Sequence, residues 1–431
     1  MQQQVQPLTW RDETPSFARR PVLPRGQGRS YGDSCLNEGG VLLTTRALDR
    51  FISFDEQTGV LRCEAGVTLG AILEVVVPRG FFLPVLPGTK HVSVGGAIAN
   101  DIHGKNHHRA GTFGRHVKKL ELMRSDGSRR ELEPGNPLFA ATIAGLGLTG
   151  LITWAEVQLR RVPGPCIRTE AVPFDSLEEF LQLTGESDAN WEYTVAWIDS
   201  TSRSPGRGVF LRGEHSEGQA RRSSRRLRVP VDLPAFTLNR YTVRAFNRAY
   251  RWATRRGTRV VHYDPFFFPL DSVQDWNRIY GRPGFFQFQC VVPEIGTIES
   301  LLTRVARTGN GSFLTVLKTF GDIPSPGMLS FPRKGFTLTL DFANRGAGTL
   351  ALLEELEREI REASGALYPA KDARMSRATF LAGTPRLAEF EPHVDPAFSS
   401  SFWRRVSASD QNASHDCRGL KNVAPPQTGG D

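Results

Sequence analysis

Three glycine-rich loops in the first 152 residues constrain the fold of this chain more than any other feature. They read PRGQGRSYGD at 24–33, PGTKHVSVGGAIANDIHGKNHHRAGTFG at 87–114 and AGLGLTGLI at 144–152. Glycine adopts positive φ without strain and leaves backbone N–H groups uncovered by a side chain. Consecutive N–H groups that point inward form an anion-binding nest, so such loops can surround a pyrophosphate. Taken singly, each loop is equally well explained as an ordinary turn.

The second loop combines small residues with a polar end. Its segment 93–99 (SVGGAIA) would let the start of a helix approach a cofactor closely, and the helix dipole would add positive potential there. The polar end contains His103, His107 and His108. These histidines could be metal ligands, but no carboxylate or cysteine cluster accompanies them. We therefore predict hydrogen bonding to a ligand and no metal site.

The pattern around the loops predicts an α+β fold. Short strands are expected at 41–45, 51–54 and 60–66, followed by a helix that Thr68 caps and Pro78 ends. The Asp-Gly pair at 126–127 lies between two alternating runs and predicts a tight hairpin. Because strands and helices do not alternate regularly, a doubly wound Rossmann sheet is not supported.

The proline and glycine segment at 161–165 predicts a domain boundary, since 431 residues suffice for two cores. A long helix is expected at 349–365 with Gly365 as its C-cap. The polar, aperiodic tail beyond Val406 is predicted to be disordered. The β segments expected after the boundary are 191–199, 284–293, 312–320 and 335–342. The side chains expected to share one face of the long helix are Leu350, Leu353, Leu356 and Ile360.

The chain carries a net charge of +9, from 54 Lys+Arg against 45 Asp+Glu, with much of the excess at 221–228 and 251–259. A solvated surface explains these runs, and contact with an anionic substrate or membrane surface is the alternative. A non-enzymatic basic module that binds nucleic acid would leave the glycine loops unexplained. No nucleic-acid-binding motif accompanies the charge, so we expect no nucleic-acid partner.

The five cysteines are odd in number and form no CxxC pair, which argues for a reducing compartment. The first residues lack the basic start and apolar core of a signal peptide. No apolar run approaches the roughly 18 residues that a spanning helix needs. The expectation is a protein that is cytoplasmic or peripherally attached to a membrane.

Together, RGQGRSYGD, PGTKHVSVGGAIANDIHGKNHH and GLGLTG resemble the FAD-binding (PCMH-type) domain of the vanillyl-alcohol-oxidase-type flavoproteins. Within that superfamily the chain is most similar to the decaprenylphosphoryl-β-D-ribose 2-oxidases. The similarity continues in AWID, FPLDSVQDWNRIYG, GFFQFQCVVP, FLTVLKTFG and YPAKDAR, the last at 368–374. It covers most of the chain, except the first residues, the basic stretch near 215–260 and the tail.

The resemblance implies a PCMH-type, two-subdomain FAD-binding domain at 1–163 and an antiparallel-sheet, substrate-binding cap domain at 164–365. It also implies a C-terminal segment at 366–406 that returns to the FAD domain, followed by the tail at 407–431. In relatives that attach the flavin covalently, a histidine precedes the serine of the first loop. Arg29 precedes Ser30 here, so FAD is expected to bind without a covalent bond.

The resemblance also implies which residues hold the cofactor. They are Arg25, Gly26, Gln27, Gly28, Arg29, Ser30, Tyr31 and Gly32 in the first loop; Pro87, Gly88, Thr89, Val92, Ser93, Gly95, Gly96, Ala97, Asn100, Asp101, His103, Gly104 and Asn106 in the second; and Gly147, Gly150, Ile152 and Tyr368.

The catalytic residues implied by the resemblance are Lys371, Tyr31 and Lys105. A cation at Lys371 would stabilise negative charge near N1 and C2=O of the flavin, or it could orient or deprotonate the substrate hydroxyl. Without the resemblance, Lys371 followed by Asp372 would be interpreted as a surface ion pair. The implied substrate-binding residues are Gln287, Gln289, Lys318, Trp197, Thr339 and Asp341, with a buried core indole as the alternative for Trp197.

The resemblance implies an FAD-dependent oxidoreductase that oxidises a secondary alcohol of a sugar. The substrate would be a polyprenyl-phosphorylated ribose, whose 2-hydroxyl becomes a ketone in the first half of an epimerisation for cell-wall polysaccharide biosynthesis. An NAD(P)H-dependent reductase would be the partner that completes it. The alternative is a sugar-lactone or alditol oxidase that releases hydrogen peroxide. Thr339, Thr337 and Phe268 depart from the pocket pattern of the mycobacterial enzyme, so the sugar and its lipid stay open.

Overall fold

The segments between the glycine loops, together with the strand that follows the third loop, form a five-stranded antiparallel sheet. The computed structural model describes residues 3–17, 21–202, 204–218, 220, 227–254 and 257–407. The order of this sheet is β4 (Phe51–Asp55), β5 (Val60–Glu64), β9 (Leu151–Gln158), β7 (Val117–Met123) and β8 (Arg129–Leu132). Its alternating apolar residues pack into a core with α1 (Leu69–Val76). The predicted strands, the hairpin and the helix are confirmed.

Local chemistry explains the bounds of α1. The Thr68 hydroxyl accepts a hydrogen bond from the Ala71 N–H at 3.1 Å, which satisfies one of the free donors at the helix start. The helix gives way at Val77 to a short 3₁₀ turn that contains Pro78. Gly80 follows with a φ of +76°, a conformation that glycine adopts without strain.

A three-stranded parallel sheet precedes the first glycine loop. It has the order β1 (Gln4–Pro7), β3 (Val41–Thr44) and β2 (Val22–Arg25), and β2 leads directly into that loop. The end of the chain joins this sheet, because Val22 N–H donates to Ala397 and Ser399 N–H donates to Val22. Residues far apart in the sequence therefore hold the strand from which the loop starts.

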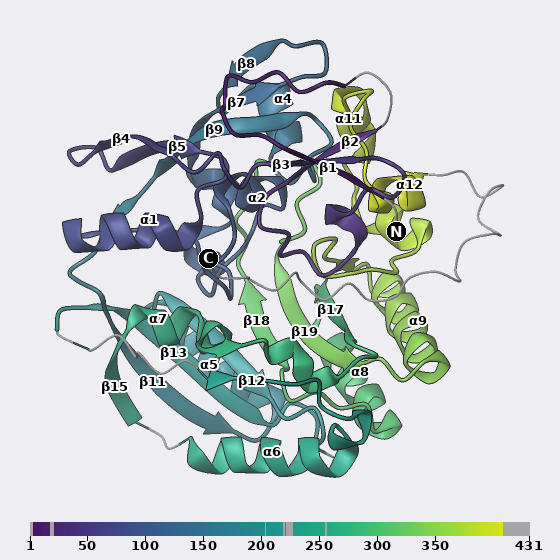
Figure 1. Cartoon of the computed structure of the whole chain (residues 1–431). Coiled ribbons are helices and arrows are strands. Elements are labelled where there is room, and N and C mark those ends of the chain that lie inside the picture. The colour runs from purple at the N-terminus through teal and green to yellow at the C-terminus, as the bar shows by residue number, and fades with distance from the viewer. Residues whose placement is uncertain are drawn as a thin grey trace.

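An eight-stranded antiparallel sheet fills the lower half of the molecule (Figure 1). The four predicted β segments form four of its central strands, and β11, β13 and β15 were not expected. Both large sheets are antiparallel and are combined with helices, which confirms the α+β class. The sheet order is β15 (Gly257–His262), β11 (Cys166–Phe174), β13 (Gly208–Ser216), β12 (Tyr193–Ile198), β18 (Val316–Phe320), β19 (Gly335–Ala343), β17 (Phe285–Val292) and β20 (Ala366–Leu367).

The two faces of this sheet differ in character because successive side chains point to opposite sides. On β17, Phe288 and Cys290 belong to an apolar core formed with α5 (Leu177–Asp188), α8 (Ile295–Thr308) and α9 (Ala347–Glu362). The alternate residues Gln287 and Gln289 point the other way and line a cavity. One face of the sheet is thus a helix-covered core, and the other is a site wall.

The predicted cap of α9 is wrong. Ala363 is the C-cap, and Ser364 rather than Gly365 takes the left-handed conformation, with a φ of +56°. Gly365 is needed for a different reason, since a Cβ there would lie 2.6 Å from the carbonyl oxygen of Val291 on β17. The predicted apolar face holds for Leu353, Leu356 and Ile360, while Leu352 replaces the half-buried Leu350.

The C-terminal segment packs back beside the first loop (Figure 1). Arg405 on α12 (Ser401–Ser407) donates two hydrogen bonds to the buried Asp33 carboxylate, at 2.8 and 2.9 Å. Ser401 N–H donates to Leu36, and the buried Asp395 pairs with Arg124 at 3.1 Å. Residues 408–431, which hold nearly all of the predicted disordered tail, lie outside the described residues, as do residues 221–226 and 255–256 of the basic runs.

The remaining elements connect these sheets. The helices are α2 (Val94–Ala99), α3 (His107–Ala110), α4 (Pro137–Thr142), α6 (Arg240–Ala253), α7 (Tyr263–Phe267), α10 (Arg377–Gly383), α11 (Leu387–Phe390) and α12 (Ser401–Ser407). The short strands are β6 (Phe81–Phe82), β10 (Arg160–Arg161), β14 (Leu227–Arg228) and β16 (Val273–Gln274). The 3₁₀ turns are η1 (Asp33–Cys35), η2 (Val77–Arg79), η3 (Phe113–His116), η4 (Ala235–Thr237), η5 (Pro269–Ser272), η6 (Trp276–Tyr280) and η7 (Glu391–His393). In the described part of the chain, no helix combines the length and apolar character needed to cross a membrane.

Candidate functional site

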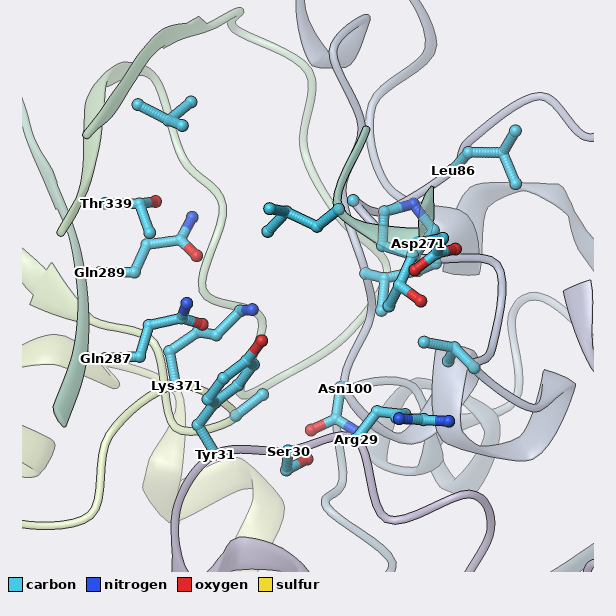
Figure 2. A pocket seen from close by; sticks show the side chains of 18 of the residues that line it. Arg29, Ser30, Tyr31, Leu86, Asn100, Asp271, Gln287, Gln289, Thr339 and Lys371 are labelled. Atoms are coloured by element: carbon cyan, nitrogen blue, oxygen red, sulfur yellow. The ribbon is translucent and has the colours of Figure 1, made fainter. Parts of the chain in front are cut away.

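A cavity of about 1080 Å³ lies between the glycine loops and the open face of the eight-stranded sheet. Figure 2 shows Gln287, Gln289 and Thr339 on one side of it, and Arg29 and Asn100 on the other. The cavity therefore joins the two parts of the fold, and it brings the three predicted loops to one place.

The first loop reaches the cavity through close backbone contacts. The loop turns at Gly28, whose φ is +62°. A Cβ on Gly26 would lie 2.1 Å from the Ser93 hydroxyl, and one on Gly32 would lie 1.8 Å from the Asp372 carbonyl oxygen. Gly26 thus lets the first loop meet the second. Gly32 lets it meet the C-terminal segment and does not itself line the cavity.

The second loop is held by the short helix α2. The Ser93 hydroxyl caps it by accepting a hydrogen bond from Gly96 N–H at 3.3 Å. Gly95 N–H donates to the carbonyl of Ala65 at the end of β5, and a Cβ on Gly95 would be within 3.1 Å of the Ala65 side chain. The small residues therefore let the start of α2 pack closely on the five-stranded sheet.

The third loop closes the wall beside α2. Its residues Ala144 and Leu146 donate backbone hydrogen bonds to Ile98 and Ala99. A Cβ on Gly150 would lie 2.6 Å from the carbonyl oxygen of Met123, so this glycine permits close packing on β7. The third loop is thus joined to the second by backbone hydrogen bonds, and the first loop packs on the second at Gly26 and Ser93.

Most of the predicted site residues line the cavity. They are Arg25, Gly26, Gln27, Gly28, Arg29, Ser30, Tyr31, Pro87, Gly88, Thr89, Val92, Ser93, Gly95, Gly96, Asn100, His103, Gly104, Lys105, Gly147, Gly150, Ile152, Trp197, Gln287, Gln289, Lys318, Thr339, Tyr368 and Lys371.

Five predicted site residues lie behind the cavity wall: Gly32, Ala97, Asp101, Asn106 and Asp341. Ala97 is a fully buried core residue. Asp101 accepts hydrogen bonds from Gly114 N–H and from two serine hydroxyls, so it fixes the loop. Asn106 donates to the carbonyl of Pro84 at 2.9 Å and is buried. In this structure the five residues support the wall, and their assignment as binding residues stays a prediction.

Lys371 lies in the turn that follows β20, and its ammonium is 4.3 Å from the centroid of the Tyr31 ring. Figure 2 shows both side chains directed into the cavity. Burial lowers the pKa of Lys371, while the neighbouring Asp341 carboxylate opposes that shift. The alternative interpretation, a surface ion pair between Lys371 and Asp372, is wrong. Asp372 is buried and accepts hydrogen bonds from the backbone N–H groups of Arg374 and Met375.

Two glutamines on β17 connect the cavity to polar groups behind it. Gln287 donates to Asp341 at 2.8 Å. The Gln289 amide donates to Nε2 of His103 at 2.9 Å, which places the proton of a neutral His103 on Nδ1. Burial lowers the pKa of His103 well below its usual value, so the ring is neutral at pH 7. His103 therefore orients Gln289 rather than carrying charge.

The three histidines do not converge on one point. His107 packs against the ring of Phe320, with centroids 4.5 Å apart, and His108 Nε2 lies 3.5 Å from the carbonyl of Trp191. Among the described residues, no group of three His, Cys, Asp or Glu side chains is placed to hold a metal ion.

Three lysines, Lys105, Lys318 and Lys371, line the cavity. Burial lowers the pKa of Lys105 to about 8. Burial, together with repulsion from Lys105 and Lys371, lowers the pKa of Lys318 to about 7. The Lys105 ammonium donates to the carbonyl of Phe267 at 3.2 Å. Since a bound phosphate would relieve this repulsion and restore the charged forms, the wall favours a phosphorylated ligand.

Part of the cavity wall is apolar, and apart from Trp197 its residues were not predicted. Trp197 extends into it and donates its indole N–H to Phe313 at 2.9 Å, so it is both buried and part of the wall. The residues that form this apolar arm with Trp197 are Leu238, Val243, Phe246, Tyr250 and Phe313. Helix α6 and its preceding turn supply four of them, and no motif in the sequence marks them as wall residues.

Asp271 in the PLD segment is a further unpredicted lining residue. It accepts a hydrogen bond from Lys90 N–H at 3.0 Å, and the Lys90 ammonium pairs with Asp264. These contacts fasten the 263–272 segment over the second loop. Figure 2 shows Asp271 beside Leu86, across the cavity from Gln287. Asp271 belongs to the FPLD motif at 268–271, which is part of the sequence resemblance. Nothing in that motif indicated that Asp271 lines the cavity.

Comparisons with known proteins agree with this geometry. The family of FAD binding domains matches residues 15–133. Decaprenylphosphoryl-beta-D-ribose oxidase of Mycolicibacterium smegmatis is 37% identical over 414 residues, covering 90% of this chain and 89% of that protein. The uncharacterized protein in the mprA 5' region of Streptomyces coelicolor is 34% identical over 369 residues, covering 79% of this chain and all of that protein. Alditol oxidase of a Streptomyces species is 32% identical over 120 residues, 28% of this chain and 29% of that protein.

Proposed function

This chain belongs to the family of FAD-dependent oxidoreductases that includes decaprenylphosphoryl-β-D-ribose oxidase, and from that premise we propose that it oxidises the 2-hydroxyl of a polyprenyl-phosphorylated ribose to a ketone. FAD is its cofactor, and it acts on a CH–OH group. The observation that carries the substrate proposal is one cavity that combines the flavin loops, three half-buried lysines and an apolar arm.

The loops fit the diphosphate of FAD. Gly26 and Gly28 leave the backbone open, and the buried Nε atoms of Arg25 and Arg29 have no hydrogen-bond partner among the described residues. Such donors suit an anion that accepts several hydrogen bonds. Because Arg29 stands before Ser30, FAD would be held without a covalent bond. When bound, FAD supplies an acceptor for the hydride of the carbinol carbon.

The sheets support the proposed domain division. The three-stranded and five-stranded sheets use residues up to 158, so 1–163 would form the two-subdomain FAD-binding domain. The eight-stranded sheet would be the cap domain at 164–365. The returning segment at 366–406 contributes Lys371 to the cavity, although its first residues, β20, pair with β17 in the cap sheet.

The three lysines would contact different groups of the substrate. Lys371 lies beside Tyr31 and Gln287, where it would hold the sugar hydroxyl and accept or share its proton. Its lowered pKa suits that role, because a larger fraction of the amine is unprotonated near neutral pH. Lys105 and Lys318 would bind the phosphate, and Gln289 would orient the sugar.

The apolar arm would hold the first part of the polyprenyl chain. Its wall contains aromatic and aliphatic side chains, which a free polyol or lactone would not need. A lipid-linked substrate also suggests peripheral attachment to the cytoplasmic side of a membrane. The ketone product requires re-reduction for the carbon to invert, so the expected partner is an NAD(P)H-dependent reductase.

An anaerobic flavin-reduction assay tests the proposal. Polyprenylphosphoryl ribose should bleach the flavin of the wild type, while a free polyol should not. Lys371→Ala should retain FAD and lose this bleaching, and Lys119→Ala, at an ion pair with Glu131 on the far sheet, should behave as wild type. Bleaching by a polyol with release of peroxide would instead assign the chain to the alditol oxidases, to which part of it is similar.

A further inference from the structure

Exposed aromatic side chains gather on helix α6 and on the turn η4 that precedes it. Trp252 is 83% exposed, Phe236 77% and Tyr241 67%. Figure 1 shows α6 at the lower edge of the molecule, opposite the edge that carries β8. Soluble proteins rarely leave large aromatic side chains together in water unless the patch meets a partner.

The helix presents these rings outward for a geometric reason. Val243 and Asn247 are buried, and the Asn247 amide donates to the Asp199 carboxylate at 2.8 Å, so this side of α6 faces the protein. At 3.6 residues per turn, Tyr241 and Trp252 fall on the opposite side. Asn239 fixes the start of the helix with a capping box. Helix α6 therefore holds the aromatic rings of Tyr241 and Trp252 on its side away from the protein.

The charged side chains of helix α6 itself are all basic. Helix α6 contains four arginines, Arg240, Arg244, Arg248 and Arg251, and no Asp or Glu. Arg251 forms an ion pair with Asp175 at 2.8 Å, while Arg244 and Arg248 are exposed to solvent. A surface with aromatic rings beside exposed guanidinium groups is complementary to an apolar layer covered by phosphates.

We propose that the outward face of α6, with Phe236 beside its start, docks on an anionic lipid bilayer. The assignment deepens the proposed function and rests on it for the lipid-linked nature of the substrate. Exposed aromatic rings next to arginines on the outward side of a helix suit the membrane interface, where the rings enter the headgroup region and the guanidinium groups meet lipid phosphates. A second copy of this chain would set the same arginines against one another, which like-charge repulsion disfavours.

The position of α6 connects the bilayer with the cavity. Thr242, Val243, Phe246 and Tyr250 line the cavity from the helix, while Tyr241 and Trp252 do not. One side of α6 therefore borders the apolar arm, and the other side faces the lipid. A polyprenyl chain can pass beside the helix from the bilayer into the arm without exposing its length to water.

Vesicle sedimentation of the FAD-loaded enzyme, without substrate, tests the docking surface. The wild type should sediment with vesicles of phosphatidylcholine and phosphatidylglycerol and much less with phosphatidylcholine alone. Arg244→Gln with Arg248→Gln should lower the partition coefficient about 25-fold, since each basic side chain near an anionic surface contributes about fivefold. Tyr241→Ser with Trp252→Ser should lower it by at least about tenfold.

A charge-matched control separates this face from general basicity. Lys118→Gln with Arg130→Gln removes two exposed charges from β7 and β8 at the opposite edge and should bind vesicles like the wild type. All these variants should keep wild-type flavin reduction by detergent-dispersed substrate, because none of the changed side chains lines the cavity.

Equal vesicle binding by the wild type and both α6 variants, or no binding by the wild type, would overturn the docking surface. Self-association that disappears in these variants, without vesicle binding, would assign the face to a second copy and overturn it as well. Failure of the proposed reaction is a separate result, since vesicle binding would persist while the ribose substrate left the flavin oxidised.

Discussion

Replacing Gly32 by alanine tests whether the contact between the first loop and the C-terminal segment positions Lys371. The backbone of Gly32 has a φ of −113°, which alanine adopts without strain, so the effect is purely one of space. The new Cβ would lie 1.8 Å from the Asp372 carbonyl oxygen. Real Cβ atoms stay at least 3.0 Å from such an atom, so the two backbones must separate by about 1.2 Å.

The separation has two expected costs. Overpacking costs about 1–3 kcal/mol. Loss of the adjacent hydrogen bond from Tyr31 N–H to Ala370, now 2.8 Å, adds about 1 kcal/mol. Together they come to about 2–4 kcal/mol, which should lower the Tm by about 4–16 °C, since a domain of this size shifts by about 2–4 °C for each kcal/mol. Because Lys371 is next to Asp372, a displacement of about 1 Å should slow flavin reduction roughly 100-fold.

The assay pairs thermal unfolding, followed by flavin fluorescence, with anaerobic stopped-flow reduction by the ribose substrate. Gly185→Ala on α5 is the matched control, because a Cβ there meets no atom within 4 Å, and it should be neutral or slightly stabilising. A Gly32→Ala enzyme with wild-type Tm and wild-type reduction rate would refute the reasoning.

Three further predictions concern the charged groups of the cavity. Lys371→Met should keep FAD absorbance and lose substrate-dependent bleaching; retention of turnover would remove Lys371 from the mechanism. The pKa of Lys318 is lowered to about 7, so its charged form is lost as pH rises through that value. Affinity for the phosphorylated substrate should therefore fall between about pH 7 and 9, with proton uptake on binding in calorimetry, and Lys318→Gln should flatten this dependence. Asp341→Asn removes the carboxylate that opposes the lowered pKa of Lys371, so the pH profile of flavin reduction should shift to lower pH; an unchanged profile would show that the two groups are not coupled.

Much of the site was predictable from sequence because backbone requirements leave a local signature. Gly26, Gly28 and Gly150 stand where a close approach or a positive φ excludes a side chain, and such positions are visible as glycine clusters. The hairpin at 126–127 and the cap at Thr68 follow from equally local chemistry. These elements were correct because neighbours in the sequence determine them.

The sequence reveals least where distant segments decide the outcome. Ser325 and Ser330 approach the Asp101 carboxylate from more than 200 residues away and donate hydrogen bonds to it, which no local pattern around Asp101 indicates. The apolar arm depends on α6 crossing the end of the cavity, which no local pattern of arginines and aromatic residues reveals. The predicted C-cap of α9 was wrong because Gly365 is required for close packing on β17 and not for ending the helix.

The return of the C-terminal segment has a consequence for biosynthesis. The first loop is secured by Ala370 and, through Asp33, by Arg405, while Ala397 holds the strand before it. A ribosome must therefore synthesise the chain beyond Arg405 before these contacts can form. A truncated product that ends before Arg405 would lack the ion pair that secures the first loop.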